Sequence, residues 1–256
     1  MTQTLALITG ASGGIGLELA RLHARKGGDL LLVARRGDVL DDIAADLRQA
    51  HGVTVDTVAA DLTTLEGVRA TVAAAEGRPV EVLINNAGYG GRGLFVERDL
   101  SDDLAMVDLN VKALMVLCHS VGAAMVARGR GRILNVASTA GMMPGPLQAT
   151  YFASKAFVRS FSFALAEEMR GTGVTVTALS PGYVVTGFAA RADLDGTDLT
   201  KSGRSAASVA KVGYDAMRLG KLEVVNEPAL SFASKAVLPF VPTRALMRMV
   251  RKMQTK

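Results

Sequence analysis

Three side chains in the middle of this sequence can together move a proton to or from an oxygen atom. Tyr151 and Lys155 are four residues apart in the stretch Tyr-Phe-Ala-Ser-Lys, and Ser138 precedes them. On a helix, residues i and i+4 share a face, so the phenol and the ammonium can point into one cleft. A neighbouring ammonium lowers the pKa of a phenol, which is about 10 when unperturbed. We predict that Tyr151 exchanges a proton with a carbonyl or alcohol oxygen, which the Ser138 hydroxyl polarises.

A second group of residues, near the amino terminus, is rich in glycine. The run Thr-Gly-Ala-Ser-Gly-Gly-Ile-Gly follows an apolar stretch and opens a helix-like one. Glycines in this context allow a pyrophosphate to approach a helix N-terminus closely, although they also serve ordinary strand-to-helix turns. The predicted cofactor-binding residues of this run are Thr9, Gly10, Ser12, Gly14, Ile15 and Gly16.

The end of the second predicted strand favours NADP(H) over NAD. An acidic residue that binds the ribose 2′-hydroxyl of NAD is expected about 20 residues after the glycines. The sequence instead has Arg35 and Arg36, with no carboxylate beside them. Two guanidiniums suit the 2′-phosphate of NADP. The alternative is that both arginines are solvated charges at a strand end, followed by Asp38 as a helix cap.

Short β-branched, apolar runs alternate with helix-like segments along the chain, which indicates βαβ units. We expect an α/β fold, a doubly wound (Rossmann-type) parallel sheet of about seven strands with helices on both faces. The predicted strands are 5–9, 30–34, 54–59, 80–85, 132–137, 174–180 and 222–225. The predicted helices are 15–26, 39–49, 65–76, 103–127, 149–170 and 206–219, several with a glycine just past the end. The stretch 187–205 is predicted to be a mobile surface loop and a candidate lid.

Composition limits the classes to which the protein can belong. The chain has 256 residues, of which 49% are hydrophobic and 21% charged, and this suits one domain with a sheet covered on both faces. Cys118 is the only cysteine, so neither an intrachain disulfide nor a cysteine metal cluster can form, and no metal site is predicted. No signal peptide and no run of about 18 uncharged apolar residues is evident, so we expect a cytoplasmic protein that is soluble or at most peripheral to a membrane.

Taken in order, these motifs resemble those of the short-chain dehydrogenase/reductase family, in its short single-domain branch, from residue 5 to about residue 226. The resemblance implies that Asp61 and Leu62 lie beside the adenine. It implies further coenzyme contacts by Asn86, Ala87, Gly88, Pro181, Gly182, Val184 and Thr186. Among these, Val184 would meet the nicotinamide amide and Thr186 a carboxamide or phosphate. The turns at these motifs are also plausible without a ligand.

The same resemblance assigns four catalytic positions. Tyr151 would be the acid in reduction and the base in oxidation, with Ser138 beside it, and Lys155 would hold the nicotinamide ribose. Asn110 would bend a long helix and hold a water in a proton relay to Lys155. A homodimer or homotetramer is also implied. The three histidines, His23, His51 and His119, fall in or just after predicted helices and are expected to be surface or packing residues.

The last thirty residues depart from the family's most frequent ending. We divide the chain into a catalytic domain, 1–226, and an apolar, basic extension, 227–256. From residue 228 onward there is no Asp or Glu, and the basic residues are Lys235, Arg244, Arg248, Arg251, Lys252 and Lys256. Thr243 is predicted to cap a helix with Leu246, Met249, Val250 and Met253 on one face. Packing on the core or on a second subunit is favoured, ahead of peripheral membrane contact and of covering the substrate cleft. No nucleic-acid binding is expected, because no aromatic stacking platform accompanies the charge.

The predicted pocket walls are mainly apolar and come from loops after the strands. They are 89–95, 142–146, Tyr183 and Phe188, which suit an apolar ketone, aldehyde or acyl-type carbonyl. We therefore expect an NADPH-dependent oxidoreductase that reduces such a compound to an alcohol, reversibly. An NAD-linked hydroxy-sterol or hydroxyacyl dehydrogenase is the first alternative and depends on Arg35. The second is a non-catalytic NADP-binding sensor, which predicts a broken Ser/Tyr/Lys set.

Overall fold

Strand β1 (Leu5–Thr9) is buried along its whole length, and its side chains alternate between two cores. Ala6 and Ile8 pack in one apolar cluster, and Leu5 and Leu7 pack in another on the opposite side of the strand. A strand with two apolar faces must lie inside a sheet that is covered on both sides. The computed structural model describes residues 4–256, and the side chains of all of them except 234, 235 and 239. It confirms the predicted doubly wound sheet.

The main sheet is parallel and has seven strands in the order β3-β2-β1-β4-β5-β6-β9. Its other strands are β2 (Asp29–Ala34), β3 (Val55–Ala59), β4 (Val80–Asn85), β5 (Gly131–Val136), β6 (Val174–Leu179) and β9 (Glu223–Val224). All seven predicted strands are present, each within one residue of its predicted ends. A second sheet of two short strands, β7 (Val184–Val185) and β8 (Arg204–Ser205), was not predicted.

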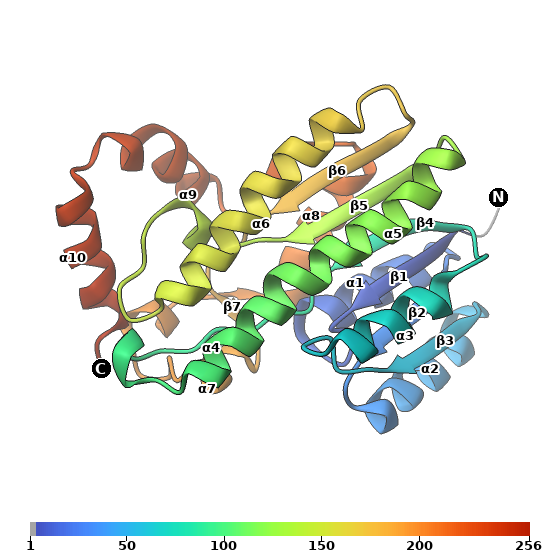
Figure 1. Ribbon diagram of the computed structural model, residues 1–256, viewed down its shortest axis with the longest axis horizontal. Coiled ribbons are helices and arrows are strands. Elements are labelled where there is room, and N and C mark those ends of the chain that lie inside the picture. The colour runs from blue at the N-terminus through green and yellow to red at the C-terminus, as the bar shows by residue number, and fades with distance from the viewer. Residues whose placement is uncertain (1–3) are drawn as a thin grey trace.

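Six longer helical segments cover the two faces of the sheet (Figure 1). On one face α1 (Gly14–Ala24), α2 (Gly37–His51) and α8 (Ala206–Arg218) supply the core residues. On the other face the core residues come from α3 (Leu65–Ala75), α5 (Leu114–Ala127) and α6 (Ala149–Glu168). The strand order reverses between β1 and β4, so a crevice opens at the carboxyl ends of these two strands.

The long predicted helix 103–127 is interrupted by a π-helical turn. Helix α4 (Leu100–Val107) continues through η2 (Asp108–Ala113) into α5, and Asn110 lies in the π-helical turn. In the part of the chain that the structure describes, Leu100–Ala127 is the one helix whose length and composition would let it cross a membrane. Here Leu114 and Leu117 are buried in the core beneath the sheet, so α5 acts as a core helix.

The stretch 187–205, predicted as a mobile surface loop, contains regular secondary structure. The segment contains α7 (Phe188–Arg191), η4 (Asp198–Thr200) and β8. Ala189, Ala192 and Leu194 are buried in a small apolar cluster with Tyr183 and Phe188. Apolar side chains at helix-like spacing give this segment a core of its own, and we call residues 187–205 the lid.

The C-terminal tail, 227–256, forms one end of the molecule (Figure 1). It consists of α9 (Pro228–Phe232), η5 (Ala233–Val237), η6 (Leu238–Phe240) and α10 (Thr243–Gln254), of which α10 alone was predicted. Pro242, not Thr243, precedes α10, and no side chain caps the helix. Leu246 and Val250 pack against α6 and η3 (Thr139–Met142), whereas Met249 and Met253 are exposed. The predicted apolar face is therefore only half buried. Residues 1–3 and the side chain of Lys235 lie outside the described residues.

Candidate active site

The turn after β1 can be built only from glycine at two positions. Gly10 has a φ of +66°, and a Cβ there would lie 2.8 Å from Nδ2 of Asn86. At Gly16 a Cβ would lie 2.4 Å from the Gly10 carbonyl oxygen. Helix α1 has no side-chain cap and no acidic residue in its first turn. Its first backbone N–H groups are therefore left for an anionic ligand.

Thr9 and Asn86 join this turn to the end of β4. The Thr9 hydroxyl accepts hydrogen bonds from the backbone N of Asn86 and of Ala87, each at 3.0 Å. The Asn86 side chain donates to the Thr9 and Gly10 carbonyls at 2.9 and 3.2 Å. Ile15, also predicted as a coenzyme contact, packs partly buried against the core. Thr9 and Asn86 thus hold the turn in shape, which is a supporting role.

A cavity of about 400 Å³ opens beside this turn. Eight predicted coenzyme residues line it: Gly10, Ser12, Arg35, Arg36, Asp61, Leu62, Ala87 and Gly88. Five residues that were not predicted complete its wall: Ala34, Ala60, Thr63, Leu109 and Arg191. The volume is in the range of small-molecule sites. A glycine turn with free amides and a wall with several guanidiniums fit the anionic, adenosine-bearing part of a dinucleotide.

Two of the charged groups in this cavity are held in place by hydrogen bonds. Arg36 donates to the backbone oxygen and the hydroxyl of Ser12 at 3.1 and 3.2 Å. Asp61 accepts from the backbone N and hydroxyl of Thr63 at 2.9 and 2.8 Å. Burial acts to raise the pKa of Asp61, but the Thr63 hydrogen bonds and Arg35 together bring it below its usual value. Asp61 is therefore a carboxylate acceptor at neutral pH.

Ser138, just after β5, lies close to Tyr151 and Lys155 in the first turns of α6. Ser138 accepts a hydrogen bond from the backbone N of Ala140 at 3.1 Å. Its hydroxyl also forms a hydrogen bond with the side chain of Tyr151. Lys155 is buried and lies 5.9 Å from the centroid of the Tyr151 ring. Its Nζ donates to the backbone oxygen of Val136 at 2.8 Å. The one-cleft arrangement predicted from the i, i+4 spacing is present.

The predicted lowering of the phenol pKa by the ammonium is not found. Burial raises the pKa of Tyr151 to about 12, and the hydrogen bond with Ser138 only reduces this shift. Burial also lowers the pKa of Lys155 to about 8, and its ammonium is turned toward Val136. The chain's own groups thus keep Tyr151 protonated throughout the neutral range, which is the state a proton donor to a carbonyl requires.

Asn110 lies in the π-helical turn and holds the loop after β4. Its Nδ2 donates to the Tyr89 carbonyl and to the Ser154 hydroxyl, both at 3.0 Å, and its Oδ1 accepts from the Tyr89 backbone N at 3.1 Å. A Cβ on Gly88 would be within 3.0 Å of Asn110 and 3.3 Å of Lys155, so the two lie on either side of this glycine. Since both Nδ2 protons are used, a relay water at Asn110 would have to bond an oxygen of this residue.

The segment after β6 brings the lid to the site. Pro181 accepts from the backbone N and the hydroxyl of Thr139, and Gly182 N donates to Oδ1 of Asn226. Val184 is buried in β7. Thr186 lies against the glycine turn, because a Cβ on Gly14 would be 3.3 Å from its methyl group. These positions are consistent with coenzyme contacts at Val184 and Thr186, but the residues do not line the main cavity.

The side chains that pack around Tyr151 are only partly those predicted for the pocket wall. Phe188 packs on Tyr151 with ring centroids 5.3 Å apart, and Met143 lies in the same cluster. Tyr183 instead packs within the lid. Tyr89 donates its hydroxyl to the Asp102 carbonyl at 3.0 Å, and its ring faces Arg191. The tail residues Leu246 and Val250 pack in the same apolar cluster as Tyr151 and Met143.

Two features near the site were not predicted from the sequence, the position of Arg191 and a buried glutamine pair. Arg191 lies in the predicted lid, but nothing in the sequence separates it from Lys201 and Arg204 of the same segment. Only Arg191 reaches the cavity, because α7 directs it there. Gln148 and Gln254 form a buried pair, described below, that no local pattern signals. Among the described residues no cluster of His, Cys, Asp or Glu is arranged to hold a metal ion.

A family model described as short chain dehydrogenase matches residues 4–195. The chain belongs to this family. As a short-chain dehydrogenase it is an oxidoreductase that acts on CH–OH and C=O groups, and its fold binds a nicotinamide coenzyme. When bound, this coenzyme supplies or accepts the hydride.

Individual relatives of this dehydrogenase include several reductases. The monensin polyketide synthase putative ketoacyl reductase of Streptomyces virginiae is 42% identical over 197 residues, which are 74% of each chain. A very-long-chain 3-oxoacyl-CoA reductase of Laccaria bicolor is 37% identical over 70% of this chain, but the match spans only 54% of that protein. A short-chain dehydrogenase from Sphingobium yanoikuyae, solved with NADPH, is 31% identical with a TM-score of 0.86 and covers 99% and 98% of the two chains. Another structural relative, from Burkholderia phymatum, was solved with NAD (25% identity, TM-score 0.83, 99% and 97% of the two chains).

Proposed function

We propose that the protein is an NADPH-dependent reductase of apolar ketones, aldehydes or acyl-type carbonyls. The observation that carries the proposal is the grouping of Ser138, Tyr151 and Lys155 beneath the apolar ring of Phe188. In this proposal Ser138 polarises the carbonyl oxygen and Tyr151 gives it a proton. Lys155 stabilises the phenolate that remains and binds the nicotinamide ribose. Asn110 holds the loop that faces Lys155.

The choice of NADP(H) rests on the end of β2. Arg35 and Arg36 both line the cavity, and Asp61, the single carboxylate in the lining, is already bonded to Thr63. Arg35 makes no hydrogen bond or ion pair with any described residue, so its donors are available to a phosphate. The NADPH complex of the Sphingobium yanoikuyae relative supports the same choice, and the NAD complex of the Burkholderia phymatum protein keeps NAD as the alternative.

The substrate class rests on the wall beside Tyr151. Phe188, Met143 and Phe152 surround the phenol, with Leu246 and Val250 of the tail behind them. Contact with these side chains stabilises a bound apolar substrate, because it removes apolar surface from water. The ketoacyl and 3-oxoacyl-CoA reductases among the relatives act on acyl-type carbonyls by name, which supports including that group in the class.

The experiment is a titration of the purified protein with NADPH and NADH, followed by a screen of ketones, aldehydes and 3-oxoacyl thioesters for loss of NADPH absorbance. We expect tighter binding of NADPH and turnover of apolar members of the panel. Arg35→Asp should weaken NADPH and spare NADH. Tighter NADH binding in the wild type would favour the NAD-linked dehydrogenase, and binding without turnover across the panel would favour a sensor.

We further propose a cytoplasmic homodimer or homotetramer. Leu104, Met115 and Val116 are large apolar residues exposed on the α4–α5 helix, and burying them between subunits would remove them from water. Light scattering after gel filtration should give a dimer or tetramer mass. Aspartate in place of Val116 should shift that mass toward the monomer.

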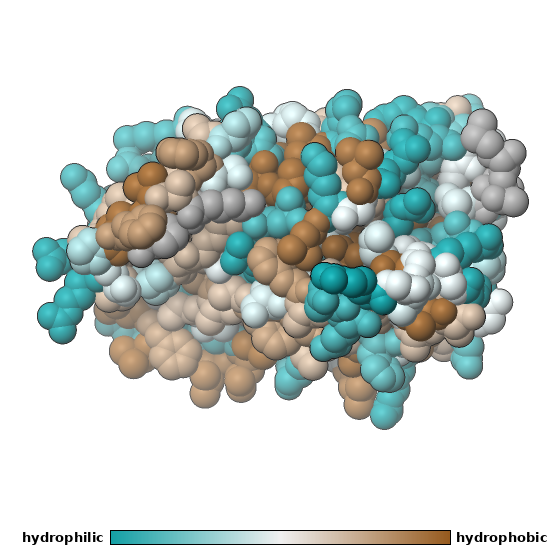
Figure 2. All heavy atoms as spheres, turned by 90° about the horizontal axis from the view of Figure 1, so that it is seen from above, coloured by the Kyte–Doolittle hydropathy of each residue, from teal (hydrophilic) through white to brown (hydrophobic). Residues whose placement is uncertain are grey.

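Peripheral membrane contact through the tail is a separate proposal. Figure 2 shows apolar side chains gathered at the end of the molecule that the tail forms, and Phe232 and Phe240 are 68% and 84% exposed there. Sedimentation with vesicles that contain anionic lipid tests it. The wild type should pellet with the vesicles, and a Phe232→Ser/Phe240→Ser variant should not. Equal pelleting of both proteins, or of neither, would contradict the proposal.

A further inference from the structure

The lid places a cation in the coenzyme cavity. The guanidinium carbon of Arg191, the last residue of α7, lies 4.1 Å from the centroid of the Tyr89 ring. The same side chain lines the cavity together with Arg35 and Arg36. It makes no hydrogen bond or ion pair with any residue that the structure describes. Its N–H donors are therefore available to a ligand, while the ring of Tyr89 fixes the guanidinium plane.

The charges around this cavity are unbalanced. Three guanidiniums and the one carboxylate of Asp61 give its lining a formal charge of +2. The pKa of Arg191 is lowered, first by burial and then by the positive charge of the nearby Arg35. Like charges that share a cavity repel each other unless an anion enters. A phosphate monoester, with a charge of about −1.5 to −2 at pH 7, would neutralise the excess.

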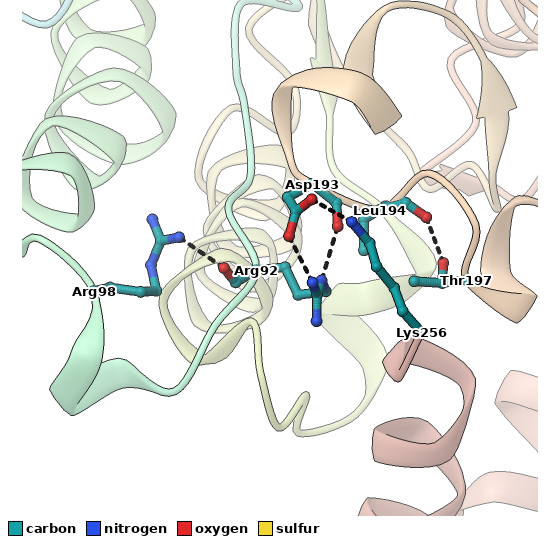
Figure 3. Close-up of polar contacts among 6 residues, drawn as sticks. All are labelled: Arg92, Arg98, Asp193, Leu194, Thr197 and Lys256. Carbon is teal, nitrogen blue, oxygen red and sulfur yellow. Dashed lines mark hydrogen bonds and ion pairs between the residues drawn. The ribbon is translucent and has the colours of Figure 1, made fainter.

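Just after α7 the lid is held by Arg92 and Lys256, which both bond Asp193 (Figure 3). Asp193 accepts hydrogen bonds from Nε and Nη2 of Arg92, to its carbonyl and carboxylate oxygens, at 2.8 and 2.6 Å. Its second carboxylate oxygen accepts from Nζ of Lys256 at 2.5 Å. Its φ of +55° turns the chain sharply just after α7. Arg92 is thus engaged with the lid, and Arg191 is the lid cation that faces the cavity.

We propose that Arg191 is a third ligand of the 2′-phosphate of NADP(H), supplied by the lid to complete the pair Arg35 and Arg36 on the sheet. The proposal rests on the proposed coenzyme. Because α7 carries Phe188 against Tyr151 as well as Arg191 in the cavity, a lid closed on the phosphate also covers the catalytic phenol. Coenzyme recognition and closure of the substrate side then depend on one short helix.

The test is the dissociation constant of NADPH and of NADH, measured by calorimetry for the wild type, Arg191→Gln and Arg191→Lys. Loss of a charge-assisted hydrogen bond to phosphate should weaken NADPH about 10- to 100-fold in Arg191→Gln and change NADH less than about 2-fold. Arg191→Lys keeps the charge but not the planar donors, so its loss should be smaller. Lys201→Gln, in the same lid but paired on the surface with Asp198, is the matched control and should bind both coenzymes like the wild type.

Two further measurements distinguish a wrong role for Arg191 from a wrong choice of coenzyme. The fragments 2′-AMP and 5′-AMP should differ, with only 2′-AMP weakened by Arg191→Gln. Equal losses for NADPH and NADH would instead assign Arg191 to the pyrophosphate and overturn the proposal, as would unchanged NADPH binding. If Arg35→Gln abolishes a preference for NADPH while Arg191→Gln leaves it intact, only the role of Arg191 fails. If the wild type shows no preference for NADPH, the proposed coenzyme fails, and the role of Arg191 with it.

Discussion

The side chain of Gln148 donates a hydrogen bond from Nε2 to Oε1 of Gln254 at 2.6 Å, across 106 residues of sequence. Gln148 is the residue before α6, three positions ahead of Tyr151, and Gln254 is the last residue of α10. Both are buried, with 3% and 0% of their surfaces exposed. The remaining Oε1 of Gln148 and Nε2 of Gln254 have no partner among the described residues. The end of the tail is thus tied directly to the turn that carries Tyr151, the proposed proton donor.

Removing one half of this pair should destabilise the protein. In Gln254→Leu, Gln148 keeps a buried amide with no partner, which costs about 1–3 kcal/mol. Urea unfolding should show this loss, and KM for the ketone should rise because Gln148 precedes Tyr151. In the double variant Gln148→Leu/Gln254→Leu most of the stability should return, since no polar group is left unpaired. Gln49→Leu on the exposed side of α2 is the control, and a Gln254→Leu protein as stable as wild type would disprove the pairing.

Tyr151→Phe should retain coenzyme affinity and lose turnover. The phenol is the proton donor in the proposed reaction, and general acid catalysis contributes about 100- to 10,000-fold to the rate. We expect kcat to fall by about that factor, and the dissociation constant of NADPH to change less than about 3-fold, as measured by stopped flow and calorimetry. Tyr183→Phe, a tyrosine of the lid cluster, should leave kcat unchanged. Activity in Tyr151→Phe close to that of the wild type would refute the assignment.

The rate of the proposed reduction should fall at alkaline pH. Burial lowers the pKa of Lys155 to about 8, so its ammonium loses its proton as the pH rises through this value. The charge that stabilises the Tyr151 phenolate after proton donation is then lost. A plot of kcat/KM against pH should descend with an apparent pKa near 8. Lys155→Arg stays charged throughout, so whatever activity it keeps should lack this descent. A flat wild-type profile up to pH 10 would contradict the role of this ammonium.

His23 should make the folded protein sensitive to acid. Its Nε2 donates to the Thr4 carbonyl at 2.9 Å, and its Nδ1 therefore accepts from the Tyr214 hydroxyl at 2.8 Å. Burial lowers the pKa of His23 below 6.5. As the pH falls below 6.5 the unfolded chain takes up a proton that the folded chain resists. The free energy of unfolding then falls by up to about 1.4 kcal/mol per pH unit.

Urea unfolding at pH 7.5 and 5.5 measures this effect. The wild type should lose more stability than His23→Gln over this interval, although the variant starts from a lower stability because its hydrogen bonds are altered. The exposed His51 offers the matched variant, His51→Gln, which should behave as the wild type does. An equal loss in the wild type and in His23→Gln would show that other groups cause the acid sensitivity.

The amino-acid sequence by itself determined the sheet, its topology class and most of the coenzyme cavity. Short apolar runs such as 5–9 and 80–85, in alternation with helix-like segments, indicate buried strands, and parallel strands place their carboxyl ends at one edge. The glycines at 10 and 16 and the arginines at 35 and 36 therefore had to meet there. The four-residue spacing of Tyr151 and Lys155 placed both side chains on one face of a helix for the same kind of local reason.

Tertiary structure alone decided the properties that depend on distant segments. The pKa of Tyr151 is raised because burial outweighs the hydrogen bond with Ser138, while the Lys155 ammonium is bonded to Val136, and no spacing encodes that balance. Arg191 enters the cavity and Arg92 does not, because α7 and Asp193 set their directions. Gln148 forms its hydrogen bond with Gln254 only when the tail packs against α6. Local patterns specify helices and strands, whereas desolvation and long-range pairing depend on which surfaces finally touch.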